Sequence, residues 1–242
     1  MVVWKREDLL GNTLAHSVWM RTSHTLARGD DSWVSAAGPD RVDLPNELGL
    51  IYGKPVVALQ AGVRFAIAWS RQMNVALTQH VVRVRVFENN QAPVPVVVSD
   101  LNGDHQEDPQ IVIDRRGDIV VAWRRWAADL NSNVIEAMRR LDGDWQPVQP
   151  LSDPARLSSR PRLATNGLRL GHASTWVTWA EEGDPMTGRV RAAGAWAAPV
   201  PIDTEFTSEP SKIGGLAVNE AGDIVAIWSG LDDARVRARR FE

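Results

Sequence analysis

The sequence predicts an all-β protein built from about five copies of one structural unit. Tryptophan is unusually frequent, with eleven residues against one tyrosine and four phenylalanines. The tryptophans recur within the same local pattern, and prolines open most of the units. No segment shows a sustained apolar period of 3.6 residues, which would indicate helices. These observations together indicate a repetitive chain of short strands.

The clearest unit ends at Trp123 and reads Pro-Gln-Ile-Val-Ile-Asp, Arg-Arg-Gly-Asp, Ile-Val-Val-Ala-Trp. The last unit ends at Trp228 and reads Leu-Ala-Val-Asn, Glu-Ala-Gly-Asp, Ile-Val-Ala-Ile-Trp. The tryptophans that align across all the units are Trp4, Trp69, Trp123, Trp179 and Trp228. The prolines that open four of the units are Pro55, Pro109, Pro161 and Pro210. One order of landmarks therefore repeats along the chain.

Each complete unit resolves into four short strands, which in the clearest unit span 111–113, 119–124, 134–139 and 145–151. The second strand is a nearly continuous apolar run, as expected where both faces of a sheet are buried. The third strand alternates more, which indicates one face toward solvent. Gly-Asp and Asp-Gly pairs supply turns. A four-stranded unit of about 50 residues predicts the blade of a β-propeller, with the repeated tryptophan packed between adjacent blades.

We expect a single propeller domain over residues 1–242. The first unit lacks its first strand, and the last unit ends after its third strand. Such incomplete units leave unpaired strand edges, so self-association through the end strands is expected. Closure of the ring, completion by a second copy and membership of a longer propeller all stay open. The expected blades are roughly 1–52, 53–106, 107–158, 159–208 and 209–242.

The pattern Pro-x-Ile-x-Val-Asp-x-x-Gly-Asp-x-Val-x-x-Trp, followed by Gly-x-Trp-x-x-Pro, resembles that of uncharacterised bacterial propeller-repeat proteins. In size and repeat number the chain is also similar to the tachylectin-type lectin propellers, which bind amino sugars between blades. Sialidases are the enzymes that this architecture suggests. Their blades carry the box Ser-x-Asp-x-Gly-x-Thr-Trp, and residues 142–145 and 31–33 approach it only in part. A sialidase also uses a Tyr–Glu nucleophile pair, and the single tyrosine here is Tyr52.

The sharpest local motif runs from Asp100 to Asp108 and reads Asp-Leu-Asn-Gly-Asp-His-Gln-Glu-Asp. Oxygen ligands at alternating positions, with a glycine at the turn, can wrap around Ca²⁺. The motif resembles the calcium loops of FG-GAP propeller repeats, which implies Asp100, Asn102, Asp104 and Asp108 as calcium ligands. The corresponding connection in the next unit, 152–161, is shorter and has one acid, which favours a plain polar linker instead.

Composition excludes several function classes. The net charge of −3 gives no electrostatic basis for binding nucleic acid. There are no cysteines for a disulfide, a thiolate metal site or a cysteine nucleophile. No apolar run is long enough for a membrane span, and residues 1–8 do not read as a signal peptide. A cytoplasmic location is therefore expected, unless the chain is a fragment of a secreted protein.

No catalytic constellation stands out in the sequence. The five histidines, His16, His24, His80, His105 and His172, are spread along the chain without metal-ligand spacing and are predicted to be scattered surface or turn residues. Arginines on the third strands form either a basic belt or, as the acidity of the chain favours, ion pairs with acids of nearby turns. We therefore expect a non-catalytic binding or scaffolding propeller for a glycan or a protein. The alternative is a carbohydrate-active enzyme, a sialidase-like glycosidase or lyase, which would gather carboxylates and arginines at the channel mouth.

Overall fold

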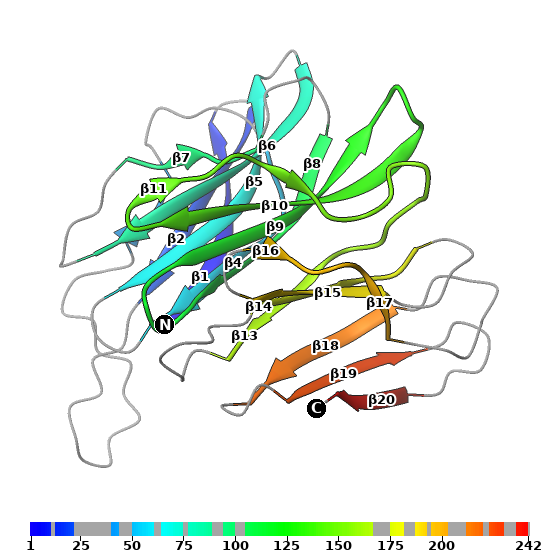
Figure 1. Ribbon diagram of the computed structural model, residues 1–242. Coiled ribbons are helices and arrows are strands. Elements are labelled where there is room, and N and C mark those ends of the chain that lie inside the picture. The colour runs from blue at the N-terminus through cyan, green and yellow to red at the C-terminus, as the bar shows by residue number, and fades with distance from the viewer. Residues whose placement is uncertain are drawn as a thin grey trace, which may run out of the picture.

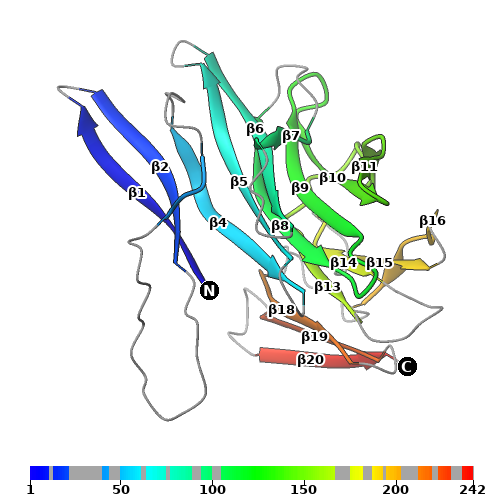
Figure 2. The same cartoon turned by 90° about the vertical axis from the view of Figure 1, so that its left-hand side faces the viewer.

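The computed structural model places twenty strands in five antiparallel sheets (Figures 1 and 2). None of the described residues is helical. The described part of the chain therefore contains no helix that could cross a membrane. The structure describes residues 1–10, 13–21, 40–43, 50–60, 64–74, 77–88, 94–99, 105–166, 175–181, 187–192, 195–202, 212–219, 223–229 and 236–241.

The sheets follow one another in chain order. The first contains β1 (Val2–Leu10), β2 (Thr13–Arg21) and β3 (Asp40–Arg41). The second contains β4 (Ile51–Leu59), β5 (Phe65–Asn74), β6 (Leu77–Phe87) and β7 (Val96–Val97). The third contains β8 (His105–Ile113), β9 (Ile119–Ala127), β10 (Ser132–Leu141), β11 (Asp144–Trp145) and β12 (Gln149–Pro150).

The last two sheets repeat this plan. The fourth contains β13 (Arg162–Thr165), β14 (Thr175–Trp179), β15 (Thr187–Ala192), β16 (Ala195–Trp196) and β17 (Val200–Pro201). The fifth contains β18 (Lys212–Val218), β19 (Ile224–Ser229) and β20 (Val236–Phe241). In the third and fourth sheets the predicted fourth strand is divided into two short pieces that pair with the same neighbour.

Strand register confirms which strand the first sheet lacks. In the third sheet Trp123 lies opposite Glu136, the residue of β10 that also pairs with β12. In the first sheet Trp4 lies opposite Trp19, the residue of β2 that also pairs with β3. β1 is therefore the second strand of its unit, and the first strand is the missing one. The fifth sheet ends after its third strand, as the sequence also predicts.

Four of the five repeated tryptophans pack between consecutive sheets, as predicted, and the fifth, Trp4, is half-buried. Trp69, Trp123 and Trp179 have no exposed surface, and Trp228 is 4% exposed. Each belongs to an apolar cluster that includes side chains of the preceding sheet: Val18 and Val42 for Trp69, Val82 and Val84 for Trp123, Ile135 and Leu151 for Trp179, and Ile202 for Trp228. Complete burial of so large a side chain makes these tryptophans dominant contributors to the packing between sheets.

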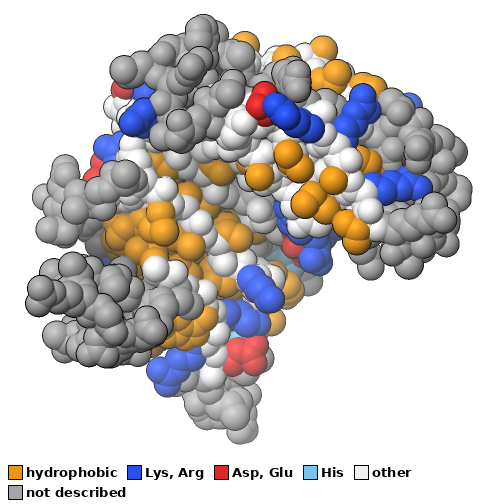
Figure 3. Space-filling view, turned by 90° about the horizontal axis from the view of Figure 1, so that it is seen from below, with side chains coloured by type: hydrophobic (Ala, Val, Ile, Leu, Met, Phe, Trp, Pro, Cys, Tyr) orange, Lys and Arg blue, Asp and Glu red, His pale blue; other side chains and the backbone are white. Residues whose placement is uncertain are grey.

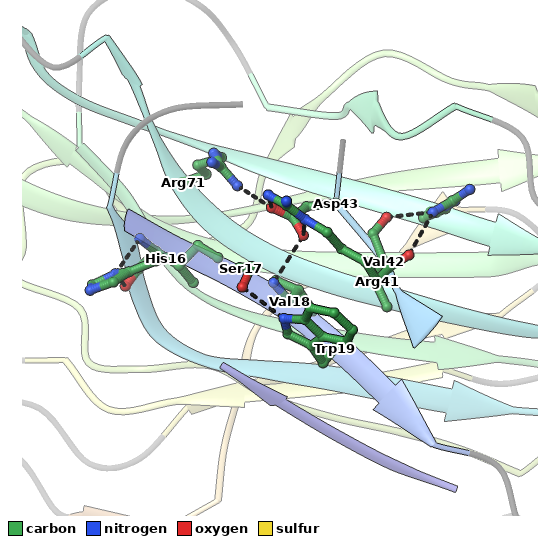
Figure 4. A network of polar contacts seen from close by, with 10 residues as sticks. His16, Ser17, Val18, Trp19, Arg41, Val42, Asp43 and Arg71 are labelled. Atoms are coloured by element: carbon green, nitrogen blue, oxygen red, sulfur yellow. Dashed lines mark hydrogen bonds and ion pairs between the residues drawn. The ribbon is translucent and has the colours of Figure 1, made fainter. Parts of the chain in front are cut away.

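In the first three units a polar side chain also connects the end of the unit to its third strand. A side-chain oxygen at the end of the unit accepts a hydrogen bond from a backbone N–H of the third strand. The donors are Val18, Val82 and Ile135, and the acceptors are, in the same order, Asp43, Ser99 and Ser152. Asp43 differs from the two serines because it carries charge. It has no exposed side-chain surface and forms an ion pair of 2.8 Å with Arg71 of the second sheet (Figure 4).

Arginines of two third strands form ion pairs, the interpretation that the sequence favours, whereas Arg85 in the second sheet donates to the backbone carbonyl of Val42. Arg139 pairs with Asp118, and Arg240 pairs with Asp223 at 2.9 Å. Each acid directly precedes the second strand of its unit. In the strand register the arginine lies opposite the residue two positions after the acid. One ion pair therefore recurs at the same place in two units.

The fifth sheet has an exposed apolar face. Ile227 directly precedes Trp228, as Ala68 and Ala122 directly precede their tryptophans. Ala68 and Ala122 are buried against the next sheet, whereas Ile227 is 42% exposed. Figure 3 shows apolar side chains at the surface on this side of the molecule, interspersed with arginines and lysines.

Candidate active site

An open cavity of about 560 Å³ lies between the second and third sheets. It is found at the end of these sheets where the first strands begin and the second strands finish. First strands of consecutive sheets pack on one another, so the cavity lies where two such strands meet. The side chains that line it include Tyr52, His80, His105, Glu107, Arg124 and Trp126.

Bulges in the first strands shape the wall of the cavity. The pairing of β8 with β9 shifts between Glu107 and Gln110, and Asp108 within this bulge has a φ of 53°. The pairing of β4 with β5 shifts likewise after Tyr52, where Gly53 has a φ of 69°. Prolines in both bulges are tolerated because no ladder hydrogen bond is needed there.

Tyr52 and Glu107 occupy the same position in successive units. Tyr52 lies opposite Ser70 and Glu107 lies opposite Arg124, and each partner directly follows the repeated tryptophan. The repeat thus places a phenol in one unit and a carboxylate at the equivalent position in the next, and both line the cavity.

His80 connects these two side chains. Its ring stacks on that of Tyr52 with centroids 3.5 Å apart, and His105 meets its edge at 4.7 Å. The Nδ1 atom of His80 lies 3.2 Å from Oε1 of Glu107. His80 is only 3% exposed, so these neighbours hold its ring in one orientation.

Glu107 is held as a carboxylate. The hydrogen bond with His80 is the main cause that lowers the pKa of Glu107 to about 2, and burial opposes this shift. The guanidinium of Arg124 lowers the pKa further, with Nη2 of Arg124 3.0 Å from Oε2 of Glu107. Except at strongly acidic pH, Glu107 is therefore ionised and places a negative charge in the cavity.

Asp108 lies beside the cavity, where two arginines engage its carboxylate. Its Oδ2 atom lies 3.1 Å from Nη2 of Arg124 and 3.1 Å from Nε of Arg160. This residue is the last of the four predicted calcium ligands. The other three, Asp100, Asn102 and Asp104, lie outside the described residues, so the calcium loop stays a prediction.

The expectation that the histidines are scattered is wrong for His80 and His105. They are 25 residues apart and lie in different sheets, yet their rings are in contact. Sequence reasoning also missed Glu107 and Arg124 as partners of these rings. The signal that could have found them is the repeat itself, because aligned units place His80 at the start of one third strand and Glu107 in the next first strand.

The comparisons with known proteins bear on the fold. No family model matches the chain, and no curated protein does. Among solved structures, an α-L-arabinofuranosidase from Fusarium graminearum matches with a TM-score of 0.56 at 11% identity, over 99% of this chain and 71% of that one. The fold is a β-propeller.

Two further solved structures illustrate the range of these similarities. An α-L-arabinanase from Penicillium chrysogenum gives a TM-score of 0.52 at 14% identity, over 99% of this chain and 71% of that one. A protein of unknown function from Dyadobacter fermentans gives 0.50 at 15% identity, over 83% and 68%. The chain spans 59% of a glycosyl hydrolase from Bacteroides ovatus that it also matches.

These similarities correct the expected function. The sequence favours a non-catalytic binding or scaffolding module, whereas the propellers of stated activity named above are glycoside hydrolases. The expectation of a non-catalytic module therefore receives no support from the comparisons. In the cavity, Glu107 and Arg124 form an ion pair where the first strands begin.

Proposed function

We propose that this propeller is a carbohydrate-active enzyme that cleaves a glycosidic bond in the cavity between its second and third sheets. The observation that carries this proposal is the position of Glu107, an ionised carboxylate held by His80 and Arg124 in an open cavity. Perturbed carboxylates in clefts are characteristic of catalytic sites.

The remaining lining suits a sugar. Tyr52 and Trp126 offer aromatic surface against which the C–H face of a pyranose or furanose ring can pack. His105 and Asn133 add polar groups that can hydrogen-bond to hydroxyls. A few polar groups among aromatic side chains is the usual composition of a small-molecule site.

The chemistry that these residues support resembles that of a sialidase more than that of a two-carboxylate glycosidase. Most glycosidases use two carboxyl groups that flank the scissile bond, and sialidases use a tyrosine nucleophile instead. Asp108 is a poor second carboxylate because two arginines engage its buried Oδ2 atom. Tyr52 and Glu107 both line the cavity, and His80 contacts both of them.

A substrate screen tests the proposal. The purified chain is incubated with 4-nitrophenyl glycosides, including arabinofuranosides, mannosides and sialosides, and with plant and microbial polysaccharides. Release of nitrophenol or of reducing ends indicates hydrolysis, and ultraviolet absorbance of an unsaturated uronate product indicates a lyase. Folded protein that binds a glycan without turnover of any substrate would contradict the proposal.

Variants then connect turnover to the cavity. We expect Glu107→Gln to lower kcat/KM by about 100-fold or more, because it removes the fixed negative charge. Glu88→Gln is the matched control, since Glu88 pairs with Arg64 and Arg140 outside the cavity lining. Activity that survives in Glu107→Gln at the level of Glu88→Gln would place the chemistry elsewhere.

A further inference from the structure

We propose that His80, His105 and Glu107 bind a divalent transition-metal ion. Each residue offers one ligand atom, and the three atoms lie within 4.8 Å of one another. This inference goes beyond the proposed function and does not depend on it, because it concerns the metal alone.

The distance between two of the three ligand atoms already suits a metal site. Nitrogen and oxygen ligands of zinc lie about 2.1 Å from the ion, so two ligand atoms on one ion are about 3.0–3.4 Å apart. The separation of 3.2 Å between His80 Nδ1 and Glu107 Oε1 falls in this range. Without metal, a hydrogen bond between the same two atoms keeps the ligands together.

The surroundings hold the ligands in place. The His80 ring is buried between the rings of Tyr52 and His105. Arg124 binds the second oxygen of Glu107 and leaves the first for the ion, as partners of metal-binding carboxylates commonly do. The positive charge of Arg124 is offset in turn by Asp108, at 3.1 Å.

The donor set selects the kind of metal. Two imidazoles and one carboxylate suit Zn²⁺, Co²⁺, Ni²⁺, Mn²⁺ or Fe²⁺, whereas Ca²⁺ and Mg²⁺ prefer oxygen ligands. Three protein ligands leave one or more coordination positions open, as in catalytic metal sites. These open positions face a cavity wide enough for a small ligand.

The preceding unit supplies a natural comparison. His16 in the first sheet is equivalent to His80 in the second. His16 lies opposite Glu7 and His80 lies opposite Gln72, and both partners come three residues after the repeated tryptophan. The backbone N–H of Ile51 donates to Nδ1 of His16 at 2.9 Å, so that nitrogen is already engaged. The residue in the second sheet that corresponds to Glu107 is Tyr52, so the site between the first two sheets lacks this carboxylate.

The test is calorimetric titration of the tag-free, full-length chain with Zn²⁺, with Co²⁺ and with Ca²⁺ alone. We expect one Zn²⁺ per chain, a visible absorption band of bound Co²⁺ with nitrogen ligands, and no displacement of Zn²⁺ by Ca²⁺. His80→Asn, His105→Asn and Glu107→Gln should each weaken Zn²⁺ binding by about 100-fold or more. Asparagine is a suitable replacement because Asn133 occupies the same position in the third sheet.

His16→Asn is the matched control and should leave Zn²⁺ affinity unchanged. His105 is half-buried, so its variant keeps the test informative if the substitution at buried His80 impairs folding, which circular dichroism would show. Wild-type protein that binds no Zn²⁺ at millimolar concentration, or variants that bind it as wild type does, would overturn the proposal. A chain that binds zinc but cleaves no glycoside would overturn only the proposed function.

Discussion

His16 and His80 occupy the same position in successive sheets, yet the next sheet meets each of them with a different group. His16 receives a hydrogen bond from the backbone N–H of Ile51, and His80 faces the carboxylate of Glu107. The first contact fixes a neutral imidazole between two sheets, and the second creates a charged site. One position of the repeat thus meets a backbone group in one unit and a carboxylate in the next.

The neutral state of His16 predicts a dependence of stability on pH. Burial first, and then the charge of Lys5, hold the pKa of His16 below its usual 6.5, despite the opposing effect of Glu7. As pH falls below 6.5 the unfolded chain takes up a proton that the folded chain resists, so the free energy of unfolding decreases. Urea unfolding at about pH 8 and about pH 5 should show a smaller difference in His16→Asn than in wild type. An equal difference in both proteins would rule out His16 as the source.

The buried pair of Asp43 and Arg71 predicts a large loss of stability when the carboxylate is removed. Asp43 also accepts a hydrogen bond from Arg41, so Asp43→Ala disrupts several contacts in the interior (Figure 4). We expect the free energy of unfolding to fall by about 3–5 kcal/mol. Asp129→Ala, on the exposed turn after β9, should change it by less than about 0.5 kcal/mol. Equal midpoints of denaturation for the two variants would contradict the structural role of Asp43.

The repeated tryptophans predict different costs at equivalent positions. Trp123 is fully buried between two sheets, whereas Trp4 is half-buried. Trp123→Ala should lower the free energy of unfolding by about 3–5 kcal/mol. Trp4→Ala should cost less than half as much, because less apolar surface is lost. Chemical denaturation of both variants measures this difference, and similar losses would show that Trp4 is covered in solution.

Gly117 predicts a conformational cost. Its φ of 86° lies in a region that L-residues rarely adopt, and a Cβ there would collide with the end of the Arg64 side chain. Gly117→Ala should therefore destabilise the chain by about 1–3 kcal/mol. Gly215 has no atom near its ideal Cβ position, so Gly215→Ala should be within about 0.5 kcal/mol of wild type. Thermal melts of the two variants distinguish the effects, and a stable Gly117→Ala would show that this turn relaxes.

The sequence was sufficient to predict the repeat because local features define it. Trp4 could be aligned with Trp123 although its unit lacks a strand, since two apolar residues precede each tryptophan and two basic residues follow it. The candidate site could not be predicted in this manner. Glu107 contacts His80 only because consecutive sheets pack on one another, and no local sequence pattern around either residue predicts that contact.

The packing of each sheet on its chain neighbours has a mechanical consequence. Among the described strands, the extensive contacts between sheets join only consecutive ones. Tension between the first and fifth sheets is then carried in series through the layers that contain Trp69, Trp123, Trp179 and Trp228. Counted over the described residues, the layer of Trp228 is the smallest of the four and is expected to separate first. The layer between the second and third sheets, beside the candidate site, is the largest and is expected to resist longest.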